Sequence, residues 1–404
     1  MNWGPASLAG VGIVHEPAKL YQAMHKYLAD AGVTGVKVDC QAGVGLVPRQ
    51  GGGPASALAS HTALEESVAE HFPGNHLINC MCHSTENFYR YKWSAIARAC
   101  DDFYPRDPAS HTSHIGNAAY NSLFLGVLVH PDWDMFQSKH PAAQLHAVAR
   151  AASGSAVYVS DKPGEHDFAL LRRLVLPDGT VLRPLLPGLP TADILFNDPM
   201  CDGNTLLKVW NVNHVSALVG VFNVQGASWD RSLRRFHIHD DAPSALWTRV
   251  RPADVWAFRR GSRGAPTGHQ GFVLWQSVQL KLNHAAGPTD HILVRLSPGG
   301  SELVTVVPVM AFDGVRFAAI GLCELFNPGA AVTSCELEPH NGTRKVVVGL
   351  RGYGAFRCYC NRRPKQCELN SVNTDHIYDE EAEVMEVAIP RQAVGGTSSL
   401  AVTF

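Results

Sequence analysis

The chain has 404 residues, of which 46 % are hydrophobic and 17 % charged, proportions that are ordinary for a packed globular protein of two or three domains. Its formal net charge of −2 at pH 7 gives no basic field for the phosphates of a nucleic acid. The ten cysteines are too sparse for a disulfide scaffold, and the pairs Cys80/Cys82 and Cys358/Cys360 do not have the spacing of a zinc site.

The N-terminal sequence MNWGPASLAGVGIVHEPAK has no basic region followed by an apolar core. No stretch of about 18 apolar residues occurs later in the chain. We therefore predict a cytoplasmic protein that does not contact a membrane. If the true N-terminus of the protein is missing, any transit peptide is missing too, and a plastid location is the alternative.

From about residue 17 to residue 175, helical and extended patterns alternate. Apolar residues recur with helical spacing in PAKLYQAMHKYLADAG, with Pro17 at its start and Gly32 at its end. A short strand, GVKVD, follows. The low-complexity segment 48–60 is predicted to be a mobile loop, and HTALEESVAEHF a second helix.

The alternation continues beyond the second helix. Helices are expected in IGNAAYNSLFLG and AAQLHAVARAASG, and strands in LINCMC (77–82), in the run into Asp101, in VLVHPDW and in SAVYVSD (155–161). Strands separated by helices predict a parallel sheet, either doubly wound or closed into a (β/α)₈ barrel.

Polar residues close the apolar runs of this region, and this pattern separates the two folds. In a barrel, working residues cluster at the carboxyl ends of many different strands. A doubly wound fold is expected to carry a glycine-rich phosphate turn, and neither GxGxxG nor GxxxxGKS/T occurs. The sequence therefore favours a TIM-type barrel over residues 1–190. The polar residues in question are Asp39, Cys82, His83, Asp101, Asp102, Asp132, Asp134 and Asp161.

After residue 195 the pattern changes to short β-rich runs between Gly, Pro and Asn turns. Examples are LLKVWNV, ALVGVFNV, ELVTVVPV, KVVVGL and MEVAIP. The sequence predicts an antiparallel β-sandwich over residues 191–404.

Asp39, at the end of GVKVD, suits the nucleophile of a retaining glycosidase or transglycosidase. These enzymes use two carboxyl groups about 5–5.5 Å apart, one ionised and one protonated. Strand alternation places Lys37 on the same face as Asp39, and an ammonium group favours the charged form of a carboxylate. Lys37 would also donate hydrogen bonds to sugar hydroxyls.

The pair Asp101 and Asp102 suits the protonated role. Neighbouring carboxylates disfavour joint ionisation, so one of them is expected to hold a proton. On an extended backbone the two side chains point in opposite directions, and spacing alone does not choose between them.

Each of these residues also has a structural interpretation. In this interpretation Asp39 would be an ordinary helix N-cap or loop ligand, and Asp101 or Asp102 would be an ion-pair partner of Arg98. HPDWDMF would be an Asx-turn with a buried tryptophan, and Asp161 would be a turn residue. Satisfied polar or buried roles are expected for His83, His111, His114, Cys80 and Cys82.

Long segments in a fixed order resemble the plant-type raffinose synthase, seed imbibition protein and alkaline α-galactosidase family. They include SLAGVGIV, GVKVD, CMCH, RACDDFYPRDPASHT, HPDWDMFQSKHP, AVYVSDKPGEHDF and LVLPDGTVLRPLLPGLPT. The resemblance runs from about residue 5 to residue 230, and a weaker similarity reaches the C-terminus.

The resemblance implies roles for particular residues. Asp39 would be the nucleophile, and an Arg-x-x-x-Asp spacing from Arg98 points to Asp102 as the acid/base, with Asp101 as the alternate. The residues implied to bind the galactosyl substrate are Lys37, Cys80, Arg98, Trp133, Asp134 and Asp161.

The implied reaction is transfer of an α-galactosyl group from galactinol to sucrose through a covalent galactosyl–Asp39 intermediate. Hydrolysis of raffinose-family oligosaccharides by the same residues is one alternative, and a catalytically inactive remnant is another. We expect no metal and no cofactor, because carboxyl groups serve both steps.

The chain is short for this family. The resemblance implies members nearly twice as long, with a β-rich domain and three barrel strands ahead of the KVD segment, whereas 38 residues precede Asp39 here. We therefore expect the C-terminal part of such a protein, with about five of the eight strands that closure of a barrel requires.

Overall fold

The computed structural model describes residues 14–46, 52–176, 178–258, 269–340, 342–391 and 396–404. These residues form two compact units. Unit 1 takes its described residues from Met1–Cys100, Asn121–Asp134 and Asp230–Arg235, and unit 2 from Asp101–Tyr120, Met135–Trp229 and Phe236–Phe404. The predicted domain boundary between residues 190 and 191 stays a prediction, since units defined by packing need not follow the order of the chain.

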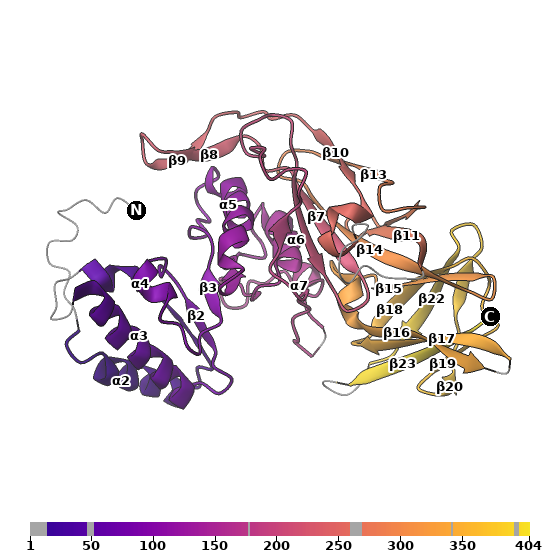
Figure 1. Cartoon of the computed structure of the whole chain (residues 1–404), viewed down its shortest axis with the longest axis horizontal. Helices are drawn as coiled ribbons and strands as arrows, with labels where there is room; N and C mark the ends of the chain where they lie inside the picture. Colours follow the sequence, from indigo (N-terminus) through magenta and orange to yellow (C-terminus); the bar gives the residue numbers. More distant parts are fainter. Residues whose placement is uncertain (1–13, 47–51, 177, 259–268, 341, 392–395) are drawn as a thin grey trace. The chain divides into compact units, whose positions relative to one another are not determined.

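Unit 1 contains a parallel four-stranded sheet in the order β1-β2-β3-β4 (Figure 1). Its strands are β1 (Val36–Val38), β2 (Leu77–Asn79), β3 (Ile96–Arg98) and β4 (His130–Asp132). Its helices include α2 (Pro17–Asp30), η1 (Ala42–Leu46), α3 (Gly52–His71) and α4 (Thr85–Phe88). Parallel strands that alternate with helices confirm the predicted α/β class.

Helix α2 has the predicted limits for local reasons. Pro17 is its first residue, where a missing N–H costs nothing, and Gly32 follows its end with φ +87°. Tyr21 and Leu28 pack on an apolar cluster with Leu64 and Val68 of α3, the helix that lies beside α2 in Figure 1. The helical spacing therefore predicted the helix, and the structure shows that Tyr21 and Leu28 lie on its packed face.

The predicted mobile loop 48–60 is wrong for residues 52–60, which form the start of α3. The rest of that segment lies outside the described residues. Pro54 stands in the first turn, where proline is compatible with a helix, and the alanines that follow favour helix propagation. Ser56 and Ala57 are buried, so packing stabilises this turn as well.

The predicted strand 155–161 is reduced to a single parallel bridge between Val159 and Phe136 in unit 2. Two residues further on, both carboxylate oxygens of Asp161 bind Ser138. One backbone bridge and the hydrogen bonds to the Asp161 side chain therefore hold this segment where the sequence predicted a full ladder of backbone bonds.

The helices of unit 2 lie before its antiparallel strands. They are α6 (Ala143–Ser153), α7 (Phe168–Leu171) and the first eleven residues of α5 (Ser110–Leu125). Gly154 ends α6 with φ +74°, and a Cβ at this position would lie 2.0 Å from the carbonyl oxygen of Leu186. Glycine is therefore required at the end of α6 by conformation and by space.

Antiparallel strands dominate the remainder of the described chain. The ten-stranded sheet contains β5 (Leu189–Pro190), β6 (Leu207–Val212), β7 (Ala217–Phe222), β11 (His269–Gln276), β12 (Lys281–Ala285), β14 (Ser301–Phe312), β15 (Val315–Leu322), β18 (Gly354–Cys360), β21 (Ile377–Asp379) and β22 (Val384–Ile389). The five-stranded sheet contains β16 (Val332–His340), β17 (Thr343–Arg351), β19 (Gln366–Leu369), β20 (Val372–Asn373) and β23 (Thr397–Thr403).

Smaller elements complete this list. β8 (Ala227–Asp230) pairs with β9 (Arg235–Ile238), and β10 (Leu246–Val250) pairs with β13 (Ile292–Leu296). The short 3₁₀ helices are η2 (Pro252–Asp254), η3 (Trp256–Phe258) and η4 (Pro328–Ala331).

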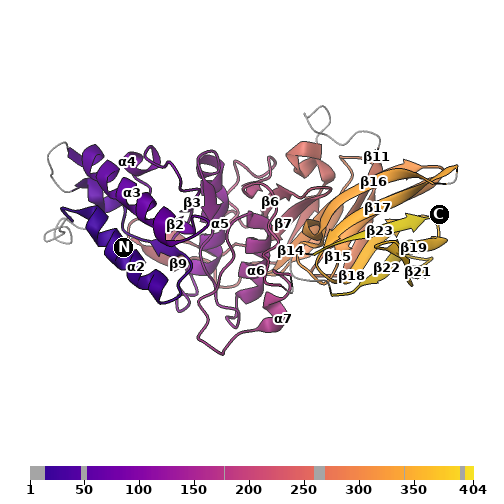
Figure 2. The same ribbon diagram turned by 90° about the horizontal axis from the view of Figure 1, so that it is seen from below.

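The two large sheets pack face to face in unit 2 (Figure 2). Phe317 and Phe356 of the ten-stranded sheet share a buried cluster with Val346, Val348 and Leu400 of the five-stranded sheet. This core confirms the predicted antiparallel sandwich, whose inner faces exclude water.

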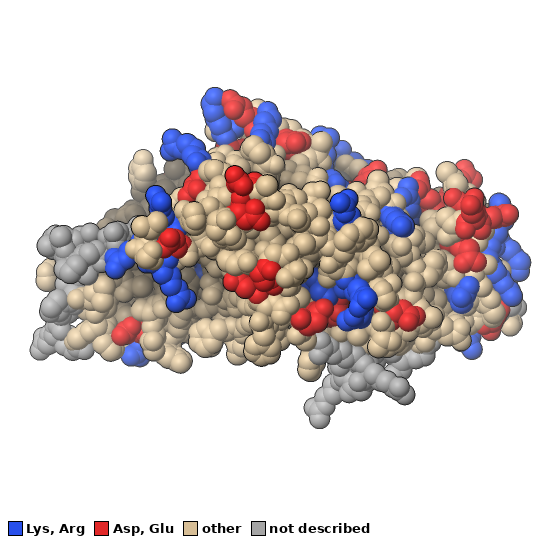
Figure 3. Space-filling model, turned by 90° about the horizontal axis from the view of Figure 1, so that it is seen from above, with Lys and Arg blue, Asp and Glu red and all other residues tan. Residues whose placement is uncertain are grey.

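On the face drawn in Figure 3, positive and negative side chains are interspersed, as the near-zero net charge suggests. Among the described helices, none is long and apolar enough to cross a bilayer.

Candidate active site

The candidate site of unit 1 lies at the carboxyl ends of the parallel strands, which meet at one edge of the sheet. Lys37 lies on β1, and Asp39 follows this strand. Cys80 follows β2. Arg98 ends β3 and stands in register with Asp132, the last residue of β4. Six of the predicted site residues are therefore brought to this edge: Lys37, Asp39, Cys80, Arg98, Trp133 and Asp134.

Asp134 is the centre of a buried ion-pair network. Its Oδ2 accepts from Arg98 Nη1 at 2.9 Å, and its Oδ1 accepts from the Lys37 ammonium group. The second buried carboxylate, Asp132, has its Oδ2 at 4.0 Å from Lys37 Nζ. The charges of two carboxylates and two cations thus balance, and this pairing offsets the free-energy cost of removing charged groups from water.

The loops after β1, β2 and β4 have strained backbones. Cys40, Met81 and Asp134 have φ values of +58°, +44° and +65°, in a region that residues other than glycine seldom occupy. The amide of Ala42 donates to the carbonyl oxygen of Met81 at 2.7 Å and ties two of these loops together. Such strain persists only where the surroundings over-determine the conformation, and it clusters at functional sites.

Asp39 is exposed at the end of β1, and its Oδ1 accepts from the Cys40 amide at 3.2 Å. The neighbouring Cys80 is buried. Burial raises the pKa of the Cys80 thiol to about 12 against the charges of Arg98 and Lys37, and a hydrogen bond to Asp39 adds to the rise. At neutral pH, Cys80 is therefore a thiol that donates to the predicted nucleophile. Its burial agrees with the structural interpretation, and its contact with substrate stays a prediction.

Trp133 is 0 % exposed. This burial agrees with the interpretation of HPDWDMF as a turn with a buried tryptophan. Contact of the indole with a galactosyl group stays a prediction.

Asp101 and Asp102 belong to unit 2, where Asp101 is exposed and Asp102 is half-buried. The next residue, Phe103, is buried and anchors this segment. Because Asp39 belongs to unit 1, its pairing with either carboxyl group stays a prediction.

Asp161 also lies in unit 2 and is fully engaged within it. Its oxygens accept from the amide and the hydroxyl of Ser138, both at 2.6 Å, and from His166 Nδ1 at 3.0 Å. Burial raises the pKa of Asp161, but the bonds from Ser138 and His166 outweigh burial and leave it below its usual value. This arrangement agrees with the turn interpretation, and a sugar contact stays a prediction.

Two polar residues that were not predicted from the sequence, Asn79 and Gln41, connect the strands and the loop of the site by hydrogen bonds. Asn79 is fully buried on β2, where its Nδ2 donates to the carbonyl oxygen of Ile96 and its Oδ1 accepts from Gln41 Nε2 at 2.9 Å. Gln41 Nε2 also donates to the carbonyl oxygen of Val38. An asparagine inside the apolar run LINCMC was the available signal. Within the described residues, no group of three or more His, Cys, Asp or Glu side chains is arranged to hold a metal ion.

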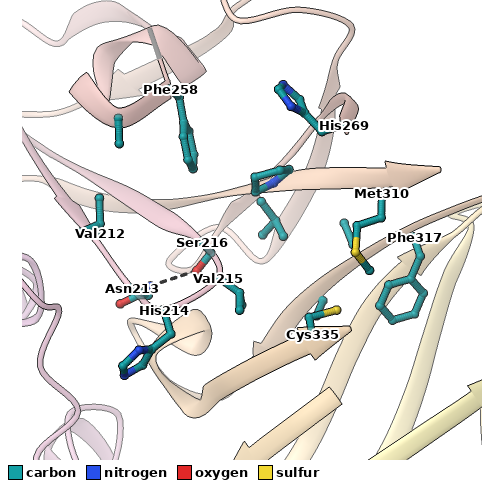
Figure 4. A pocket seen from close by; sticks show the side chains of 15 residues that line it. Val212, Asn213, His214, Val215, Ser216, Phe258, His269, Met310, Phe317 and Cys335 are labelled. Atoms are coloured by element: carbon teal, nitrogen blue, oxygen red, sulfur yellow. Dashed lines mark hydrogen bonds between the residues drawn. The ribbon is translucent and has the colours of Figure 1, made fainter. Parts of the chain in front are cut away.

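A separate cavity of about 510 Å³ lies in the antiparallel region (Figure 4). Apolar side chains such as Phe258 and Met310 line it, and Asn213 Nδ2 donates to Ser216 Oγ at 3.1 Å on one side. None of its lining residues is a carboxylic acid. The cavity therefore lacks the groups that glycosyl transfer requires.

Comparison with known proteins identifies one family. The sequence profile described as "Raffinose synthase or seed imbibition protein Sip1" matches residues 5–389.

Two plant relatives illustrate the match. "Probable galactinol--sucrose galactosyltransferase 1" of Arabidopsis thaliana is 45 % identical over 380 residues, which are 92 % of this chain and 50 % of that protein. "Galactinol--sucrose galactosyltransferase" of Oryza sativa subsp. japonica is 39 % identical over 396 residues, which are 94 % and 50 % of the two chains. The chain thus spans about half the length of these relatives.

Among solved structures, α-galactosidase I from Mortierella vinacea matches with a TM-score of 0.49 and 13 % identity, over 71 % of each chain.

Proposed function

The chain belongs to the raffinose synthase or seed imbibition protein family, and from this premise we propose that it transfers an α-galactosyl group from galactinol to sucrose. The observation that carries the proposal is the exposed carboxylate of Asp39 at the carboxyl edge of a parallel sheet, beside a buried ion-pair network. The two plant relatives described above carry the names of galactinol–sucrose galactosyltransferases.

Asp39 is proposed as the nucleophile. Its carboxylate attacks the anomeric carbon, the bond to the leaving oxygen breaks, and a covalent galactosyl–Asp39 ester forms. Exposure of the side chain allows a sugar to approach it, and the neutral thiol of Cys80 and the amide of Cys40 orient it by hydrogen bonds.

Lys37, Arg98 and Asp134 are proposed to frame the galactosyl site. The network fixes the Lys37 ammonium group by holding it on Asp134, so that the group is oriented before substrate arrives. Pre-ordered donors lose less entropy on binding than mobile ones.

Asp102, with Asp101 as the alternate, is proposed as the acid/base. The protonated carboxyl group gives its proton to the leaving inositol oxygen of galactinol and then takes a proton from the attacking sucrose hydroxyl. The product keeps the α configuration because two inversions occur.

The direct test incubates the full chain with galactinol in the presence and in the absence of sucrose, and follows the products by chromatography. We expect an α-linked trisaccharide that forms only with sucrose. Free galactose alone indicates hydrolysis, and absence of both products indicates a chain that is inactive by itself. Either result overturns the transferase proposal.

The nucleophile is tested by trapping. A 2-deoxy-2-fluoro galactosyl fluoride should label the tryptic peptide VDCQAGVGLVPR, which follows Lys37 and contains Asp39. We expect Asp39→Asn to abolish labelling and to reduce transfer to below about one thousandth of the wild-type rate. The matched control is Asp30→Asn, which changes an exposed aspartate at the end of α2. A labelled peptide that lacks Asp39 contradicts this assignment.

A further inference from the structure

A buried histidine cluster lies in unit 2. It consists of His111 and His114 on α5, His146 and Arg150 on α6, and His140 just before α6. Residues three or four apart on a helix share one face, so each helix presents its pair to the other. His140 is half-buried, and the other four members are buried.

The hydrogen bonds of the cluster have a fixed direction. Arg150 donates from Nη1 to His146 Nδ1 at 2.9 Å, because a guanidinium group has no acceptor. A neutral His146 must then carry its proton on Nε2, which lies 3.0 Å from His111 Nδ1. The bonding therefore assigns the Nε2–H form to His146 and, in turn, to His111.

Burial favours the neutral forms of His111 and His146 at pH 7. Burial lowers the pKa of His111 to about 4, and the adjacent His140 lowers it as well. The pKa of His146 lies well below its ordinary value, through burial and through the charge of Arg150. The donor chain from Arg150 to His111 is thus intact under physiological conditions.

The cluster encloses the residue that follows the two candidate acid/base groups. The ring of Phe103 lies 5.0 Å from His146, 5.4 Å from His111 and 5.6 Å from His140, measured between centroids. His140 also donates from Nε2 to the carbonyl oxygen of Pro105 at 3.0 Å. The segment from Phe103 to Pro105 is therefore held by packing and by a hydrogen bond.

We propose that His146, oriented by Arg150, is a positioning residue that fixes the segment carrying Asp101 and Asp102. The inference rests on the proposed function for the role of these carboxyl groups. That His146 holds the segment in place does not depend on that function. Phe103 follows Asp102 directly, so a shift of the ring moves the carboxyl group with it.

The test compares His146→Gln with His146→Met. Glutamine accepts from Arg150 through Oε1 and donates to His111 through Nε2, whereas methionine has a similar length and makes neither bond. We expect trypsin to cut after the exposed Arg106 about tenfold faster in the Met variant and at nearly the wild-type rate in the Gln variant. Cleavage after Arg231, in the exposed β8–β9 turn, is the internal control.

A second measurement needs no variant that weakens the fold. With ¹⁵N-labelled histidine, nitrogen–proton correlations at pH 7 should report the Nε2–H form for His146, with its signals identified by their absence in His146→Gln. The Nδ1–H form, or a doubly protonated ring, overturns the inference. Equal cleavage after Arg106 in both variants does so too.

Kinetics connect the cluster to the reaction. If the chain transfers galactose, His146→Met should lower kcat by about tenfold with little change in KM, and His146→Gln should restore kcat. If no variant or wild-type chain turns over while the cleavage and NMR results stand, the proposed function fails and the positioning role survives. If His146→Met has the kcat of the wild type, the positioning role of His146 is contradicted and the proposed function is not affected.

Discussion

At the residue scale, Asp134 joins groups that lie far apart in the sequence. It follows Lys37 by 97 residues, yet each of its oxygens accepts from a different cation in a buried setting. Asp134 also has a left-handed φ of +65°, so backbone strain and ion pairing occur in one residue. The stability of this edge of the parallel sheet should therefore depend on the charge of the Asp134 side chain.

Asp134→Asn should destabilise the protein by about 3–5 kcal/mol, because it leaves the buried Arg98 and the half-buried Lys37 without their shared carboxylate. Urea unfolding measures the change. Asp30→Asn, which breaks the exposed pair with Lys26, should change stability by less than about 1 kcal/mol. Equal losses in the two variants would contradict the view that burial makes the Asp134 network important.

At the element scale, helix α3 holds the segment that leads into β3. The buried carboxylate of Glu65 accepts from the amides of Lys92, Trp93 and Ser94, and also from His61. Burial raises the pKa of Glu65, but the bonds from His61, Ser94 and Trp93 outweigh it and hold the pKa at about 2. The Glu65 carboxylate thus accepts from the amides of residues 92–94, which lie outside the strands of the sheet.

Glu65→Gln should cost about 2 kcal/mol and should speed hydrogen exchange at the amides of Trp93 and Ser94, since a neutral amide oxygen is a weaker acceptor than a carboxylate. Glu66→Gln, on the exposed side of the same turn, is the matched control. Unchanged exchange at both amides in Glu65→Gln would show that the carboxylate does not hold this segment.

At the scale of the whole molecule, the buried titratable groups predict two separate acid transitions. His111 has a lowered pKa in the folded chain, so the unfolded chain binds more protons between about pH 6.5 and pH 4, and stability falls as the pH falls through this window. Glu65 also has a lowered pKa, and its contribution is lost between about pH 4.5 and pH 2.

We expect the free energy of unfolding to drop by on the order of 3 kcal/mol between pH 7 and pH 4 through His111. Urea titrations at several pH values measure this drop. It should shrink in His111→Gln and persist in His76→Gln, because His76 is exposed. A drop of the same size in both variants would assign the pH dependence to other groups.

Much of this protein was decided by local pattern. The limits of α2 follow from Pro17 and Gly32, and the alternating and apolar runs produced the parallel strands and the two layers of the sandwich, because periodicity and turn chemistry act over a few residues. The position of Asp39 at a strand end was likewise readable from GVKVD alone.

Only the tertiary structure decided which side chains meet. The ion-pair partners of Lys37 are Asp132 at the end of β4 and Asp134 beyond it, because parallel strands bring distant carboxyl ends to one edge. Burial turned residues 52–60 into helix, and hydrogen bonds from the amide and the hydroxyl of Ser138 to Asp161 hold the segment that was predicted as the fifth strand. The direction of the bonds from Arg150 to His111 likewise depends on two helices that no local pattern places together.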